Sequence, residues 1–307
     1  MKKFNVFFAL AFLCAGLMVS AQEQAPAIEG QDDVVKPGVA LTLAWDSKYV
    51  SKGKILNEDP VASFDACIDY YGFYLDVWGQ YDMTSRNDGS IRSSGRIRND
   101  WYRNNRRYRA EEIDYRLGYA KSFDTDISPI SLDAYWVYFQ YPQTVHTADG
   151  KETECGISLT LDNLLDKEGK AALALGTELS YSLYNEHENG EDSYFFGKVF
   201  ADYSVALCEK ATAGVKTTIY WRSHKARRAA YRGYDEDGRY HKASGFAIPN
   251  VEVQPYVKYA FNDYISAKAY VAGTWAVEQT TRAVWKKRWE HQHDAAYWCG
   301  VSVSAAW

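Results

Sequence analysis

The stretch GVSVSAAW, residues 300–307, ends the chain as an alternating strand. Val301 and Val303 share one side with the terminal Trp307, and small residues occupy the other side. Alternation with a period of two predicts a β-strand with one apolar face. Chain termini usually fray, so a final residue placed in a sheet needs a physical reason. The fold depends on which medium the apolar face meets.

The same alternation recurs along most of the chain. Most of these stretches run ten to fifteen residues, whereas a strand in a soluble protein averages about five or six and a tilted membrane strand needs about nine to eleven. The twelve predicted strands are 39–50, 61–70, 72–83, 110–123, 129–141, 153–162, 171–184, 194–207, 212–222, 250–261, 264–278 and 295–307.

The connections between these strands alternate between short and long. Short breaks fall at 71–72, 124–128, 163–170, 208–211 and 262–263, and longer segments such as 84–109 and 223–249 separate them. Outer-membrane barrels have short periplasmic turns and longer external loops. We therefore predict an all-β fold: a single antiparallel transmembrane β-barrel of about twelve strands over residues 39–307. A secreted soluble β-protein that binds polysaccharide stays open, because a soluble sheet can also have one apolar face.

The first residues predict export. MKKFNVFFALAFLCAGLMVSA, residues 1–21, has two lysines, an apolar run and a small-residue end, as a cleaved secretory signal peptide does. Residues 22–38 then form a periplasmic lead-in, and the barrel is expected in the outer membrane of a Gram-negative bacterium. Four cysteines remain, Cys67, Cys155, Cys208 and Cys299, and we expect them to be unpaired.

Aromatic side chains make up 16% of the chain and gather on the apolar face near both ends of the strands. Amphipathic rings prefer the two membrane interfaces, so Trp307 is expected in the belt beside the short turns. A terminal aromatic residue also resembles the targeting signal of bacterial outer-membrane proteins, which implies the barrel-assembly machinery as a partner.

The opposite face predicts a charged lumen in which acids outnumber bases. Rings of carboxylates favour cations, so one interpretation is a channel with mild cation preference. The other is a salt-bridge network that fills a closed barrel. The expected lumen-lining residues are Asp46, Lys48, Asp65, Asp69, Asp76, Glu112, Asp114, Arg116, Asp133, Glu178, Lys198, Asp202, Lys216, Arg222, Glu252, Lys258 and Lys268.

The long loops are strongly basic. Guanidinium groups suit phosphate and carboxylate, so the loops are expected to contact lipopolysaccharide, with an anionic solute or plain solvation as alternatives and no role for nucleic acid. The basic loop residues are Arg96, Arg98, Arg103, Arg106, Arg107, Arg227, Arg228, Lys286, Lys287 and Arg288. All six histidines also fall in these loops, without convincing metal-ligand spacing, and no catalytic motif occurs. We expect no metal site, no cofactor and no enzymatic activity.

Three elements near the start of the mature chain resemble a known family. They are Tyr49-Val50-Ser51-Lys52-Gly53, the run GFYLDVW at 72–78, and EEIDYRLGY at 111–119. These resemble the Y-x-x-R-G, G-F-Y-x-x-V-W and following strand of the TorF family of porin-like proteins, with Lys52 in place of the arginine. The resemblance covers roughly residues 47–119 and implies an outer-membrane barrel that forms a pore.

Together these features predict passive diffusion of small polar solutes through the outer membrane. The alternative is a closed structural or adhesive barrel that acts through its basic external loops.

Overall fold

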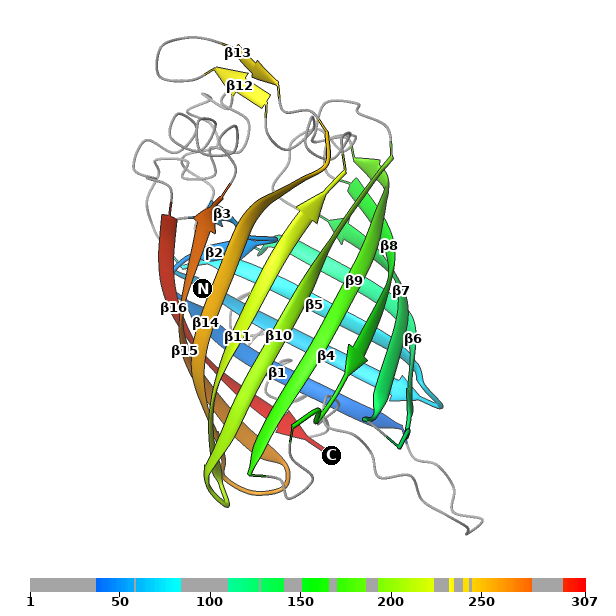
Figure 1. Ribbon diagram of the computed structural model, residues 1–307, viewed down its shortest axis with the longest axis vertical. Coiled ribbons are helices and arrows are strands. Elements are labelled where there is room, and N and C mark those ends of the chain that lie inside the picture. The colour runs from blue at the N-terminus through cyan, green and yellow to red at the C-terminus, as the bar shows by residue number, and fades with distance from the viewer. Residues whose placement is uncertain are drawn as a thin grey trace, which may run out of the picture.

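The computed structural model describes residues 37–57, 59–83, 110–126, 128–140, 151–165, 170–185, 193–223, 232–234, 240–242, 245–277 and 295–307. Within these residues no helix is long and apolar enough to span a membrane. Twelve strands form one closed barrel (Figure 1). They are β1 (Gly38–Asp46), β4 (Val61–Tyr70), β5 (Phe73–Asp82), β6 (Ala110–Phe123), β7 (Ile130–Gln140), β8 (Lys151–Leu161), β9 (Ala171–Asn185), β10 (Tyr194–Cys208), β11 (Ala211–Arg222), β14 (Ala247–Ala260), β15 (Ile265–Ala276) and β16 (Ala295–Ala306).

Every neighbouring pair in the barrel is antiparallel, and the order around the wall is β1-β16-β15-β14-β11-β10-β9-β8-β7-β6-β5-β4. The predicted antiparallel barrel of twelve strands is therefore confirmed. The last strand closes it, because β16 pairs with both β15 and β1. The amide of Val39 donates to the carbonyl of Trp307 at 3.4 Å, so the final residue takes part in the closure.

The predicted strand boundaries agree with the structure within about three residues, except for the first strand. β1 ends at Asp46, and a separate hairpin follows, made of β2 (Tyr49–Ser51) and β3 (Lys54–Asn57). Lys48 lies in the bend between β1 and β2, so its predicted place on a wall strand is wrong. The alternation of side chains continues through Val50, and this pattern cannot reveal where the backbone bends.

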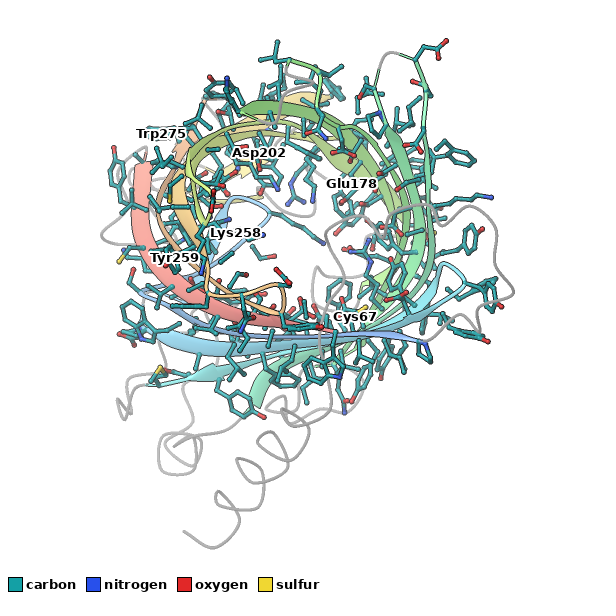
Figure 2. The ribbon with its side chains drawn as sticks, turned by 90° about the horizontal axis from the view of Figure 1, so that it is seen from below. Cys67, Glu178, Asp202, Lys258, Tyr259 and Trp275 are labelled. Carbon is teal, nitrogen blue, oxygen red and sulfur yellow. The ribbon has the colours of Figure 1, made fainter. Side chains whose placement is uncertain are left out.

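The outer face of the barrel is apolar and exposed. Phe73 is 64% exposed, Tyr297 is 62% exposed, and leucines and valines on most strands are exposed in the same way. Figure 2 shows Trp275 on the outside of the ring of strands, whereas Glu178 and Asp202 point into it. Burying a large apolar side chain is worth about 1.5–3 kcal/mol, so water is a poor medium for this face.

Aromatic side chains pack in pairs near both ends of the wall. Phe73 lies against Tyr119 beside the short turns, with ring centroids 4.9 Å apart. Trp275 meets Tyr297 edge-on at 5.8 Å near the opposite ends of β15 and β16. This placement fits the two predicted belts.

The long connections are only partly described. One of them carries a two-stranded sheet of β12 (Arg232–Tyr234) and β13 (Tyr240–Lys242). The ten predicted basic loop residues all lie outside the described residues, so their contact with lipopolysaccharide stays a prediction. The four cysteines of the described chain are free, as predicted.

Candidate functional site in the barrel lumen

The β2–β3 hairpin crosses the bore. It begins beside β1, and the side chain at its tip, Lys52, bonds Glu154 on β8 and lies over the ring of Phe196 on β10. In the order of the wall, β8 and β10 are each five strands away from β1, in opposite directions. The Lys52 side chain at the tip therefore reaches the far side of the barrel, while Gly53 lies against β14 and β15. The described contacts of residues 49–53 lie near the ends of strands that lead to the long connections, which we name the long-loop end.

Tyr49 anchors the base of the hairpin against the near wall. Its ring centroid lies 5.7 Å from that of Trp78, and its hydroxyl donates to Glu112 Oε2 at 2.7 Å. Removal from water raises the pKa of Tyr49 well above its ordinary value, and the carboxylates of Glu112 and Asp114 raise this pKa further. The phenol therefore stays protonated and can donate.

Lys52 holds the tip. Its Nζ lies 2.5 Å from Glu154 Oε1, 4.4 Å from the ring centroid of Phe196 and 5.3 Å from that of Phe139. Glu154 is 6% exposed, and a carboxylate this deeply buried is costly unless it is paired. The ammonium group thus neutralises Glu154 and uses two aromatic faces as well.

Gly53 lets the tip approach the wall closely. Its φ is +74°, and a Cβ atom there would lie 1.5 Å from Asn250 Nδ2 on β14. Thr274 on β15 donates to the Gly53 carbonyl at 3.2 Å. Only glycine combines this φ with this contact at low cost.

The three elements that resemble the TorF family meet in this one place. Tyr49 belongs to the first element, Trp78 to the second, and Glu112 to the third. The wall residues Glu154, Phe196, Asn250 and Thr274 were not among the predicted site residues. Following the inward alternation of β8 to its first residues would have found Glu154. Sequence alone gives no sign that a loop reaches these four.

Below the hairpin, the wall at β5–β7 is linked by a charged network. Arg116 pairs with Asp133, and Tyr74 donates to Asp133 Oδ1 at 2.7 Å. The guanidinium of Arg116 also lies 3.9 Å from the ring centroid of Tyr135. These contacts fix the side chains against the wall.

The wall at β9–β15 carries the lysines. Lys198 pairs with Glu178 at 3.0 Å, whereas Lys216 lies over the ring of Phe200 at 4.8 Å. Lys268 donates to Gln254 Oε1 at 3.3 Å and lies 4.5 Å from the ring centroid of Tyr256. Within the described residues, Lys216 and Lys268 form no ion pair within 4.0 Å. The positive charges of these two lysines are therefore not neutralised by an ion pair and act on ions in the bore.

The wall at β4 and β5 carries an excess of acids. Asp65, Asp69 and Asp76 form no ion pair among the residues that the structure describes. In the closed order, β5 stands opposite β11 and β4 stands opposite β10. These carboxyl groups thus lie across the bore from the strand that carries Lys216, and Asp69 and Asp76 lie toward the short turns.

The remaining predicted lumen residues also lie on wall strands. Tyr270 donates to Asp46, Tyr220 donates to Glu252 at 3.3 Å, and Tyr256 donates to Asp202 at 2.9 Å. Asp114 lies on β6, Arg222 on β11 and Lys258 on β14. The structure thus brings every predicted lumen residue except Lys48 onto the wall, while their role in selectivity stays a prediction.

No protein-family model matches the chain, and no curated protein matches it in sequence. Among solved structures it is similar to a KdgM porin, at 5% identity and a TM-score of 0.45, over 87% of this chain and 99% of that one. It is also similar to the NanC porin, at 9% identity and a TM-score of 0.45, over 87% and 98%. An anion-selective porin from Comamonas acidovorans matches at 8% identity and a TM-score of 0.36, over 88% and 98%. The resemblance to the TorF family rests on its three motifs.

Proposed function

We propose that the protein is an outer-membrane channel through which small polar solutes diffuse passively. One observation carries this proposal: a closed twelve-stranded barrel has an exposed apolar outer face and a charged inner face. A closed barrel satisfies all backbone hydrogen bonds without water, so it can stand in hydrocarbon. In this proposal the protein reaches the outer membrane of a Gram-negative bacterium after cleavage of residues 1–21, with the barrel-assembly machinery as its folding partner.

The hairpin is the constriction of this channel. It crosses the bore at the long-loop end, whereas the charged walls beside the short turns lie beyond it. Solutes that pass the hairpin then meet carboxylates on β4 and β5 and lysines on β10, β11 and β15. Acids exceed bases along the lumen, so we expect a mild preference for cations.

Planar-bilayer recording of the purified protein tests the proposal. Stepwise conductance above that of detergent-treated bilayers is the expected result. A heat-dependent shift in gel mobility and recovery from the detergent-extracted outer membrane provide the control for folding. Folded protein that gives no steps at any voltage would contradict the channel.

A second function, a closed structural or adhesive barrel, is favoured by the hairpin itself. Lys52 at its tip is bonded to Glu154 on the far wall, and a bore filled in this way needs no solute. In that case the basic loops would carry the function through lipopolysaccharide phosphates. Folded protein that does not conduct but binds lipopolysaccharide vesicles more strongly than phosphatidylcholine vesicles would support this alternative.

A further inference from the structure

We infer that the β2–β3 hairpin is a movable gate, held across the bore by the ion pair between Lys52 and Glu154. This inference rests on the proposed channel and adds to it the residues that decide whether the bore is open. The fixed point of the gate is Ser47. Its amide donates to the Cys299 carbonyl at 2.8 Å, and its Oγ accepts from the Cys299 amide at 3.0 Å. The chain is thus fastened to β16 just before the hairpin begins.

Beyond this fixed point the Tyr49 ring packs against Trp78, and the other described contacts of residues 49–53 are polar or cationic. Tyr49 bonds Glu112, Lys52 bonds Glu154, and the Gly53 carbonyl accepts from Thr274. The ion pair is partly open to water, because the Lys52 side chain is 35% exposed. Polar contacts of this kind exchange readily with water.

The closed position leaves polar groups of the wall without partners. Gln80 is 1% exposed, and within the described chain neither its Nε2 nor its Oε1 makes a hydrogen bond. It pairs in register with Glu112, next to the anchor of Tyr49. Asn250, which lies against Gly53, is 0% exposed, and its Oδ1 has no partner there either. Water can reach these amides when the hairpin leaves, which lowers the free energy of the open state.

The free energies of the closed and open positions are therefore close, and the ion pair favours the closed position. Neutralising either partner removes the charge-assisted hydrogen bond that holds the tip and should favour opening. The same pair with its charges exchanged should close again in part, because the attraction is kept while the contact of the ammonium group with the two aromatic rings is lost.

The first test measures open probability in planar bilayers. Glu154→Gln should raise it roughly threefold to tenfold, the range expected for the loss of a partly buried charged contact. Asp162→Asn is the matched control, since it removes a carboxylate at the short-turn end, where Asp162 accepts from Ser131 at 3.1 Å. The exchanged pair Lys52→Glu with Glu154→Lys should return the open probability toward that of the unmodified protein.

The second test locks the hairpin. An ideal Cβ on Gly53 would lie 2.6 Å from Asn250 Cγ, so cysteines at both positions should form a disulfide after Cys67, Cys155, Cys208 and Cys299 are replaced by serine. The oxidised protein should stay closed, and the same sample after reduction should open and close. The reduced state is the control for any strain that the substitutions add.

Two groups of results separate the gate from the channel. If all variants conduct alike, if Glu154→Gln matches Asp162→Asn, or if the exchanged pair fails to restore closure, the gate is wrong and the channel stands. Two free thiols after oxidation, in a protein whose open probability in the reduced state equals that of the unmodified protein, would contradict the closed geometry. If every folded variant is silent, including the reduced cysteine pair, the channel itself is wrong.

Discussion

The two halves of the lumen are built differently. At the long-loop end a hairpin crosses the bore and bonds to strands on the far side, so charges are paired and groups such as Gln80 are buried. In the short-turn half no described segment crosses, and Asp65, Asp69 and Lys216 carry charges without ion pairs among the described residues. In the proposed channel, the first half would decide whether a solute passes, and the second half would decide which charge is favoured.

The largest expected effect comes from removing the hairpin, so that neither half of the lumen has a segment that crosses it. Asp46 and Val61 are direct partners across β1 and β4, so residues 47–60 can be replaced by a hairpin turn of about four residues. Single-channel conductance should rise by roughly twofold or more, because the structure that crosses the bore is gone. Equal conductance with and without the hairpin would place the constriction elsewhere.

The second prediction concerns charge in the short-turn half. Replacing both Asp65 and Asp69 by lysine should move the reversal potential in a salt gradient toward anion preference, while conductance changes little. Asp263→Lys is the control, since Asp263 is exposed in the turn between β14 and β15. A reversal potential that matches the control would remove these two residues from selectivity.

The third prediction separates the stability of the barrel from the opening of the channel. Arg116→Met leaves Asp133 without its cation and should lower the free energy of unfolding by about 1.5–3 kcal/mol, as expected for a charged hydrogen bond. The hairpin contacts are untouched, so the open probability should stay the same. Denaturant unfolding in detergent measures the first quantity. No change in the unfolding midpoint would mean that this network only lines the wall.

The smallest expected effect is that Tyr49 does not ionise in the pH range in which an unfolded tyrosine does. An unfolded tyrosine has a pKa of about 10, and the pKa of Tyr49 is raised above this in the folded protein. The stabilisation from its neutral phenol is therefore present below pH 10 and is lost only as the pH rises through the higher folded pKa. Tyrosinate absorbance near pH 10 should be equal in the unmodified protein and Tyr49→Phe. A smaller signal in Tyr49→Phe would contradict the placement of Tyr49.

The two halves also differ in how far the sequence predicts them. Alternation with period two places Asp65, Lys216 and Lys268 on the inner face, because each strand keeps its phase from turn to turn. The hairpin could not be found in this way. The contacts of its tip join residues about 100 to 220 positions apart, such as Lys52 with Glu154 and Gly53 with Thr274. A chain that bends at Ser47 and Lys48 still looks like a strand in the sequence.

The three motifs of the family resemblance gave information about the hairpin that the alternation of side chains did not. Tyr49, Trp78 and Glu112 each belong to a different element of the family resemblance, and they meet around the hairpin. The resemblance therefore pointed to this region without showing what it forms. Gly53 was part of the motif too, and its positive φ gives the physical reason for a glycine there.

The central claim is that the outer face of this barrel lies in hydrocarbon, and brominated lipids test it most directly. Bromine on the acyl chains quenches tryptophans that touch lipid. Replacing the outward Trp136 and Trp275 by phenylalanine should remove much of the quenchable fluorescence of the reconstituted protein. Replacing the inward Trp78 and Trp298 should remove little. Equal losses from the two pairs, or a protein that stays monomeric in buffer without amphiphile, would contradict the account.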